Sequence, residues 1–339
     1  MLRQPEETAL IVRRALSGAL EAQLLYVIAK LGIADLLAAG PRAAGDVADE
    51  LGLHERSLYR TLRAAAAFGQ LEHTPDDRFA RTPVSDALRE GVPGSLRYIV
   101  IMNGEGQFKA YGELLHTVRT GEPAFEHLFG RPAFEHMASD SDAAATFNRA
   151  MIDLTRIIAP QLVAAYDFSG IATIADVGGG AGTLLAEILK AHPAMSGILF
   201  DLAQGLEGAE ALLEAEGVRD RVRIQAGSFF EAIPRADAIV MKHIVHDWDD
   251  EDAVRILANC RDALPDGGCV VLAERVMPER AVHPGSVQQA SSDMVVLVML
   301  NGRERTVAEF TELLARAGLT LTSVSEPTQS GMSVLEARR

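Results

Sequence analysis

The 339-residue sequence has only two cysteines, Cys260 and Cys269, and only 5% aromatic residues. Two cysteines cannot form a disulfide framework, and these two match no metal-site spacing. We therefore expect both to be packing residues in a reducing compartment. Long apolar runs are also missing, because the longest candidate, 294–300, is far shorter than the ~18 residues that a membrane-spanning helix needs. The sequence predicts neither a disulfide-stabilised secreted scaffold nor a membrane-spanning protein.

Basic residues are in the minority, with 32 lysines and arginines against 47 acidic residues and a formal net charge of −15. This charge repels phosphate backbones and anionic membrane surfaces, so we expect no nucleic-acid and no membrane partner. The first residues lack a cationic segment followed by an apolar one, which predicts no secretory signal. Together these features predict a cytoplasmic protein whose partner is a small molecule.

The length suits two domains of about 150 residues each. Residues 8–37 are good helix formers with apolar residues on every side, and such a helix must be buried. It is buried either against a second copy of the chain, giving a homodimer, or in the core of its own subunit. Residues 43–92 resemble a winged helix-turn-helix, with helices at 44–51 and 55–68, a turn at Gly52 and a hairpin at 74–82. We therefore predict a helical, winged-helix-like domain over residues 1–95.

A winged helix-turn-helix is a DNA-binding architecture in many proteins. The second predicted helix carries Arg56, Arg60 and Arg63, but its surroundings are acidic and no basic arm accompanies it. The charge pattern favours a scaffold for dimerisation. A regulator that binds DNA and senses a metabolite is the alternative.

For residues 96–167 we predict a helical connecting segment, which contains several aromatic and methionine side chains. Such residues line apolar pockets, and they also fill cores. From residue 171 onward, short apolar runs alternate with helical segments. The predicted strands are 171–177, 198–201, 222–225, 238–241 and 269–273, and the predicted helices are 183–191, 205–216, 250–263 and 307–317. This is the rhythm of a doubly wound α/β sheet, here over residues 168–339, with a closing antiparallel hairpin at 319–324 and 331–336.

The glycine-rich segment Asp176-Val-Gly-Gly-Gly-Ala-Gly-Thr183 follows the first of these strands and leads into a helix. Residues without Cβ let the backbone turn tightly and approach a ligand, which predicts a site for a nucleoside-bearing cofactor. The dinucleotide fingerprint Gly-x-Gly-x-x-Gly would place its last glycine at Thr183. That departure argues against a nicotinamide-dependent oxidoreductase, which is kept as a competing class.

In open α/β sheets, ligands bind beyond the carboxyl ends of the strands. Asp201 follows the second strand, where a carboxylate can accept both ribose hydroxyls; capping a helix is its structural alternative. Ser228 and Phe229 follow the third strand and suit an adenine edge and face. Residues 242–248, Lys-His-Ile-Val-His-Asp-Trp, follow the fourth and form the densest polar cluster. A metal bound by its histidines and aspartate is an alternative, but their spacing is unspecific, and we expect no metal.

These motifs, with Phe200-Asp-Leu202, Glu274 and Gly302-Arg-Glu-Arg-Thr306, resemble those of the class I S-adenosylmethionine-dependent O-methyltransferases of the caffeate and hydroxyindole type. That family includes bacterial enzymes that modify natural products. The resemblance covers nearly the whole chain. It implies a Rossmann-like methyltransferase sheet, S-adenosylmethionine as cofactor, and a homodimer formed through the N-terminal domain.

The same resemblance implies a cofactor-binding set of Asp176, Gly178, Gly180, Asp201, Leu202, Ser228, Phe229 and Lys242. The family usually has aspartate where this chain has Ser228, which implies a lower cofactor affinity. The acceptor pocket would be lined by Met102, Phe108, Phe147, Asn148, Met151, Asp293, Met294 and Asn301. These side chains suggest an apolar, aromatic acceptor held between methionines.

His246 occupies the general-base position of the family, with Glu274 and Glu304 flanking the imidazole and Asp247 nearby. A phenol with a pKa of about 10 is a poor nucleophile until a base removes its proton, and an imidazole suits that task. We therefore predict methyl transfer to a hydroxyl group by in-line displacement. Methylation of sulfur or nitrogen and a non-methylating reaction remain alternatives.

Overall fold

The computed structural model describes residues 5–339, with side chains from Glu7 onward, and divides them into two compact units at Phe108. The connecting segment predicted at 96–167 is thus divided between the two units. The first four residues of the domain predicted at 1–95 lie outside the described residues. No helix within residues 5–339 is both long enough and apolar enough to cross a membrane.

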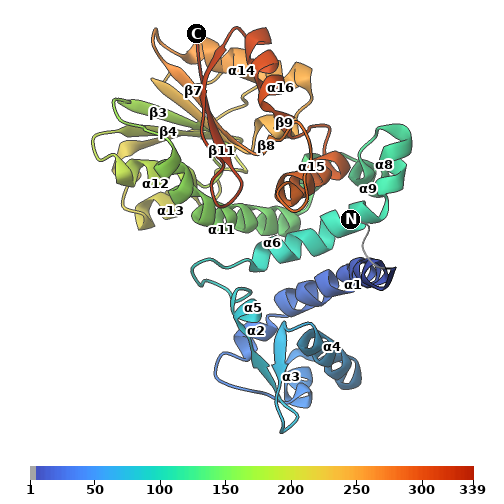
Figure 1. The fold of residues 1–339 in the computed structure, drawn as a ribbon. Helices are drawn as coiled ribbons and strands as arrows, with labels where there is room; N and C mark the ends of the chain where they lie inside the picture. Colours follow the sequence, from blue (N-terminus) through green and yellow to red (C-terminus); the bar gives the residue numbers. More distant parts are fainter. Residues whose placement is uncertain (1–4) are drawn as a thin grey trace. The chain divides into compact units, whose positions relative to one another are not determined.

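The first unit contains a helical core and one short hairpin (Figure 1). Its elements are α1 (Pro5–Lys30), α2 (Ile33–Leu36), α3 (Ala44–Leu51), α4 (Glu55–Ala67), β1 (Leu71–His73), β2 (Phe79–Arg81), α5 (Pro83–Asp86), α6 (Arg97–Met102) and the π-helix η1 (Asn103–Gln107). The strands β1 and β2 pair antiparallel. The predicted arrangement of two helices followed by a hairpin is confirmed.

The prediction of one continuous helix over residues 8–37 is wrong. Gly32 adopts a left-handed conformation with φ 64°, which separates α1 from α2. Of the two alternatives for the burial of this helix, the core of its own subunit holds only for the second half. Leu24 and Ile28 lie in the core of the unit, whereas Leu16 and Leu20 are 75% and 53% exposed. The first half of α1 therefore presents an uncovered apolar side.

The second unit, residues 109–339, begins within the first of five helices that lead to the sheet. They are α7 (Phe108–Gly112), α8 (Leu114–Thr120), α9 (Ala124–Phe129), α10 (Ala133–Ser139) and the long α11 (Ser141–Ala165). The side chain of Asp140 caps α11 by accepting from the amides of Asp142 and Ala143, which explains where this helix starts.

The sheet has seven strands in the order β10-β11-β7-β6-β3-β4-β5. Its parallel part consists of β3 (Thr173–Val177), β4 (Ser196–Asp201), β5 (Val222–Ala226), β6 (Ala238–Lys242) and β7 (Cys269–Glu274). The hairpin of β10 (Thr320–Val324) and β11 (Ser333–Arg338) closes the sheet antiparallel to β7. All five parallel strands end at one edge, and the predicted topology is confirmed.

Helices cover both faces of the sheet (Figure 1). On one face lie α14 (Asp250–Ala263) and α16 (Val307–Arg316), and on the other lie α11, α12 (Thr183–Ala191) and α13 (Ala209–Ala215). Successive residues of β6 alternate between the two cores, with Ile239 in one and Val240 in the other. Cys260 and Cys269 are free and buried, as packing residues are expected to be.

The predicted helix at 205–216 begins later, at Ala209, because Gly208 adopts φ 78° just before it. The short 3₁₀-helix η2 (Arg219–Arg221) lies between α13 and β5, and η3 (Val245–Asp247) lies between β6 and α14. The segment between β7 and α16 holds elements that the sequence did not predict, namely β8 (Val276–Met277), α15 (Val287–Met299) and β9 (Arg305–Thr306). Ser286 is the N-cap residue of α15, a residue type that marks helix starts, but its side chain makes no cap bond to the helix.

Candidate active site

The glycine turn after β3 is built from left-handed residues. Gly178, Gly180 and Gly182 have φ values of 71°, 56° and 86°. A Cβ on Gly178 would lie 2.4 Å from Cδ1 of Ile244, whereas nothing lies closer than 4.0 Å to a Cβ on Gly180. The turn therefore packs tightly at Gly178 and leaves the backbone accessible at Gly180, which fits a ligand that approaches the main chain.

Asp176 is buried directly beneath this turn. A Cβ on Gly179 would lie 2.7 Å from Oδ2 of Asp176, and that oxygen has no hydrogen-bond partner. Burial raises the pKa of Asp176 to about 7, although Lys242 opposes the shift. Burial also lowers the pKa of the Lys242 ammonium, against the carboxylates of Asp176, Glu274 and Asp247. An orphaned acceptor beside a desolvated cation is a costly arrangement that fits a binding site.

Asp201 ends β4 and connects this strand to the glycine turn. Its Oδ2 accepts the amide of Gly180 at 2.8 Å, and its Oδ1 accepts the amide of Leu202 at 2.6 Å. The helix-capping alternative for Asp201 is wrong, because α13 starts eight residues later and is preceded by Gly208. Each carboxylate oxygen keeps a further lone pair, so Asp201 can still accept ribose hydroxyls.

Ser228 and Phe229 form the turn after β5. The Ser228 hydroxyl accepts the amide of Phe230 at 3.2 Å. The ring of Phe229 meets the edge of Trp248 with centroids 5.9 Å apart. The predicted cofactor residues thus lie at the carboxyl ends of β3, β4, β5 and β6, and the accessible turn and the acceptor lone pairs of Asp201 fit S-adenosylmethionine.

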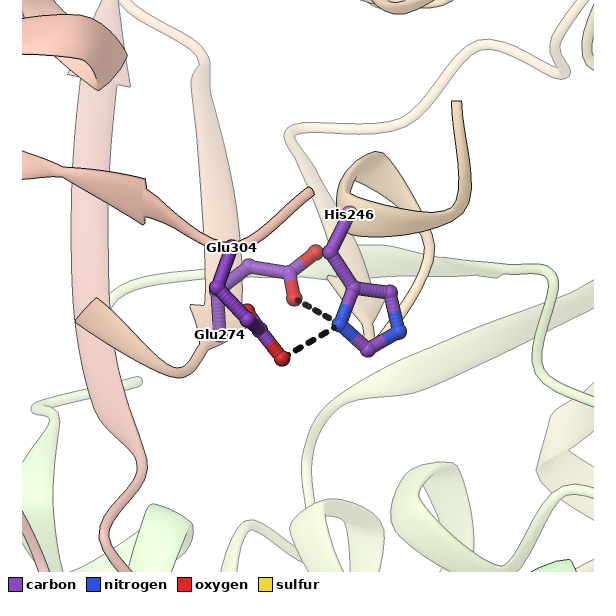
Figure 2. Close-up of side chains that lie close together, drawn as sticks. All are labelled: His246, Glu274 and Glu304. Carbon is purple, nitrogen blue, oxygen red and sulfur yellow. Dashed lines mark hydrogen bonds and ion pairs between the residues drawn. The ribbon is translucent and has the colours of Figure 1, made fainter. Parts of the chain in front are cut away.

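His246 lies in η3, just beyond the end of β6, and the carboxylates of Glu274 and Glu304 both face one nitrogen of its imidazole (Figure 2). Its Nδ1 is 2.9 Å from Oε1 of Glu304 and 3.7 Å from Oε2 of Glu274. Its Nε2 is 3.1 Å from Oδ1 of Asp247. The structure therefore brings all four predicted catalytic residues together.

The two glutamates are buried and held by bonds of their own. Glu274 ends β7, and its Oε1 accepts the amide of Val245 at 2.9 Å. Burial raises the pKa of Glu274 to about 7, although His246 opposes the shift. Glu304 accepts the Ser292 hydroxyl at 2.6 Å on the same oxygen that faces His246. These bonds fix both carboxylates around the ring.

Burial alone would lower the pKa of His246, since it disfavours the imidazolium. The charges of Asp247 and Glu274 and the hydrogen bonds to Asp247 and Glu304 outweigh burial and raise the pKa of His246 well above its usual value. The ring therefore holds a proton strongly, which makes it a strong base once that proton has left.

His243 stacks in parallel on His246, with ring centroids 5.0 Å apart. Burial and the neighbouring cations Lys242, His246 and Arg275 lower the pKa of His243 well below its usual value, so this ring is neutral. His243 has φ 55°, a conformation that non-glycine residues rarely adopt.

The geometry also identifies a possible metal-ligand group, composed of His246, Glu274 and Glu304, whose ligand atoms lie within 4.8 Å of one another. This is a different set from the two histidines and the aspartate considered in the sequence.

The residues predicted for the acceptor pocket come from several elements. Met102 ends α6 in the first unit. Phe147, Asn148 and Met151 are half-buried on α11, Asp293 and Met294 are half-buried on α15, and Phe108 begins α7. Asn301 is exposed. Asp293 also accepts the amide of Glu304 at 3.1 Å, which links α15 to the catalytic carboxylate.

Three residues at the site were missed by sequence reasoning. Ser292 binds Glu304, Gly302 packs against the backbone of His246, and Arg305 is fully buried beside η3. Gly302 and Arg305 belong to a motif that the sequence analysis used, but only Glu304 received a role. The roles of Gly302 and Arg305 depend on contacts with a distant segment, and such contacts leave no local signal in the sequence.

The chain belongs to the O-methyltransferase family. Residues 111–320 match the model of the O-methyltransferase domain, and residues 14–91 match that of the O-methyltransferase dimerisation domain. The chain is thus an S-adenosylmethionine-dependent methyltransferase with a dimerisation domain.

Relatives are similar over nearly their whole length. The chain is 40% identical to a phenazine O-methyltransferase of Lysobacter antibioticus, covering 97% of this chain and 95% of that protein. It is 35% identical to the 8-amino-8-demethylriboflavin N,N-dimethyltransferase of Streptomyces davaonensis, covering 93% and 91%. A solved O-methyltransferase from neocarzinostatin biosynthesis, in complex with S-adenosylmethionine and 2-hydroxy-5-methyl naphthoic acid, matches with a TM-score of 0.82 and 32% identity, covering 94% and 95%.

Proposed function

We propose that this enzyme transfers a methyl group to a hydroxyl of a small aromatic molecule, with His246 as the general base. The observation that carries the proposal is the imidazole of His246, held between Glu304 and Asp247 at the sheet edge where the cofactor residues lie. A hydroxyl acceptor needs such a base, because the neutral oxygen is a weak nucleophile.

The roles of the two ring nitrogens follow from their partners. Nδ1 donates its hydrogen to Glu304, which leaves the lone pair of the neutral ring at Nε2. Nε2 accepts the hydroxyl proton, and Asp247 then accepts a hydrogen bond from the imidazolium. When bound at the sheet edge, S-adenosylmethionine would supply an electrophilic methyl group on its positively charged sulfur, which would leave as the neutral thioether.

We propose that Asp201 and the backbone at Gly180 hold the ribose and methionine parts of the cofactor, with Ser228 and Phe229 at the adenine. This assignment is supported by the bond between Asp201 and the amide of Gly180, which joins two strand ends into one surface. The half-buried side chains on α11 and α15 would line the acceptor pocket. We further propose that the enzyme works in the cytoplasm.

Methylation of nitrogen is the second candidate, because the riboflavin-type relative is an N,N-dimethyltransferase. An aromatic amine attacks through its own lone pair and needs no base beforehand. The probe 3-amino-4-hydroxybenzoate separates the two reactions, since it carries both nucleophiles on one ring. Incubation with labelled S-adenosylmethionine, followed by mass spectrometry of the product, shows which atom is methylated.

We expect methylation of oxygen, and we expect His246→Ala to lower that rate by about 10²–10⁴-fold, as loss of a general base does. His283→Gln is the matched control, because His283 is an exposed histidine outside this cluster. Parallel trials with 2-hydroxy-5-methyl naphthoic acid and thiophenol cover a second hydroxyl and a sulfur nucleophile. Full activity of His246→Ala, or methylation of the amine alone, would contradict the proposal.

We also propose that the enzyme is a homodimer formed through α1. The dimerisation domain and the apolar side chains of Leu10, Leu16 and Leu20, which all point into solvent in the single chain, support it. An apolar surface of this kind is stabilised when a partner removes it from water.

A further inference from the structure

Arg305, the first residue of β9, is among the largest fully buried side chains in residues 5–339 and is 0% exposed. A buried guanidinium is stable only when its donors find acceptors. All of its nitrogens are bonded, and the acceptors are the carbonyls of Val245 and Trp248 on either side of His246, the carboxylate of Asp250, and the carbonyl of Arg303 at 3.5 Å. The partners of this cation therefore show what it holds in place.

The guanidinium bridges the two sides of η3. Nη1 donates to the carbonyl of Val245 at 3.0 Å, and Nη2 donates to the carbonyl of Trp248 at 3.0 Å. These two carbonyls enclose His246 and Asp247 in the chain. A third anchor is Asp250, whose Oδ1 accepts from Nη2 at 2.7 Å and from Nε at 3.1 Å. The planar guanidinium thus holds both ends of the segment 245–248 and the first residue of α14, the helix that follows it.

Gly302 makes a second contact with the same segment. A Cβ on Gly302 would lie 1.8 Å from the carbonyl oxygen of His246 and 2.7 Å from the amide nitrogen of Trp248. Gly302 does not adopt a left-handed φ, so the absence of a side chain there serves close approach. Between these two residues, Glu304 bonds to Nδ1 of His246. Residues 302–305 therefore contact the catalytic segment at its backbone, its imidazole and its flanking carbonyls.

We propose that Arg305 is a positioning residue for methyl transfer, which holds the backbone of residues 245–248 so that the imidazole of His246 stays between Glu304 and Asp247. The inference rests on the proposed role of His246 as the base. A base must stay within hydrogen-bond reach of the proton that it removes, so a small displacement of this segment lowers the rate. Arg305 acts through the backbone and needs no contact with the acceptor.

Arg303 provides a matched control. It binds the other oxygen of the same carboxylate, Oδ2 of Asp250, at 2.8 Å and also binds Glu309. Its side chain is 47% exposed, and no hydrogen bond connects it to residues 245–248 among the bonds of residues 5–339. Both arginines thus bind Asp250, but only Arg305 bonds to the carbonyls of Val245 and Trp248.

The test compares Arg305→Lys with Arg303→Lys in the full-length protein. Lysine keeps the charge but cannot form the fork that reaches both carbonyls. The primary readout is proton NMR of the downfield Nδ1–H resonance of His246, which needs no acceptor, together with the pH titration of that ring. We expect the resonance to shift or disappear in Arg305→Lys and to stay unchanged in Arg303→Lys.

With an accepted phenol, Arg305→Lys should lower kcat by about tenfold or more, while affinity for S-adenosylhomocysteine stays within about twofold. Should this variant fail to fold, Gly302→Ala tests the same segment, with Gly285→Ala as its control because nothing lies closer than 3.7 Å to a Cβ there. An unchanged His246 resonance and titration in a variant that only melts earlier would show a merely structural role and overturn the proposal. Failure of the base hypothesis itself is a separate outcome, since it appears as full activity in His246→Ala.

Discussion

Oδ1 of Asp247 lies 3.1 Å from Nε2 of His246, on the side of the ring opposite to Glu304. Each ring nitrogen therefore faces a carboxylate. This arrangement favours the doubly protonated ring, so the pKa of His246 is raised well above its usual value despite burial. The base strength of His246 therefore depends on how close Asp247 lies to its Nε2.

Asp247→Asn tests this connection. A base is active only when deprotonated, so the rate should rise with pH as the ring of His246 loses its proton. Removing the charge of Asp247 lowers the pKa of His246, and the rising limb of the kcat profile should move to lower pH. Asp262→Asn, at an exposed aspartate, should leave the profile in place. An unchanged profile in Asp247→Asn would mean that another group governs the rate.

Glu274→Gln should change how stability depends on pH. The native pKa of Glu274 is raised from 4.5 to about 7, so the protonated form stabilises the native state at low pH, and this contribution is lost as pH rises through about 7. Glutamine keeps the shape without the charge. Melting curves measure how much unfolding free energy is lost between about pH 5 and pH 8. This loss should be smaller in Glu274→Gln than in the wild type, by about 1–3 kcal/mol. Glu312→Gln, at an exposed position, should behave like the wild type, and equal losses in all three proteins would contradict the burial argument.

Ser228→Asp should bind the cofactor more tightly. A carboxylate at this position can keep the bond from the amide of Phe230 and add a charge-assisted acceptor for a ligand. The gain of about 1 kcal/mol corresponds to roughly fivefold in Kd. Calorimetric titration with S-adenosylhomocysteine measures it, with Ser228→Asn as the uncharged control. Weaker binding by the aspartate variant would place the adenine elsewhere.

Removal of divalent metals should leave activity unchanged. Oε2 of Glu274 and Oε2 of Glu304 have no hydrogen-bond partner, but Oε1 of Glu304 accepts from the hydroxyl of Ser292 and lies 2.9 Å from Nδ1 of His246. A hydrogen on Nδ1 that is donated to Glu304 leaves this nitrogen without the lone pair that a metal needs. The measurement is methyl transfer before and after dialysis against EDTA, then with added Zn²⁺ or Mg²⁺. Activity that is lost with EDTA and restored by one ion would instead assign the cluster of His246, Glu274 and Glu304 to a metal.

Leu16→Glu should weaken the dimer. A charge within an apolar interface is costly, and Leu16, 75% exposed, is the most exposed of the large apolar side chains described on α1. Sedimentation velocity should show a shift towards monomer at micromolar concentration. Val324→Glu is the control, since it replaces an exposed apolar residue on β10. A dimer that withstands Leu16→Glu would place the interface elsewhere.

The sequence by itself determined the doubly wound type of the sheet, its closing hairpin and the residues at its carboxyl edge. The helices α12 and α14 agree with the prediction at both ends, because their signals are local. Gly182 precedes α12, and the side chain of Asp249 caps α14 by accepting the amide of Asp252. The catalytic set followed from motifs at the ends of β6 and β7 and from the resemblance that placed Glu304 with them.

Only the tertiary structure decided what depends on distant partners. The break at Gly32 and the helix α15 were missed, although Gly32 and the N-cap residue Ser286 are local signals for a helix end and a helix start. Arg303 and Arg305 are the same residue type two positions apart, yet one is exposed and the other is enclosed by the carbonyls of Val245 and Trp248. Burial, hydrogen-bond partners and pKa depend on what the folded chain brings near each side chain, and adjacent sequence does not contain that information.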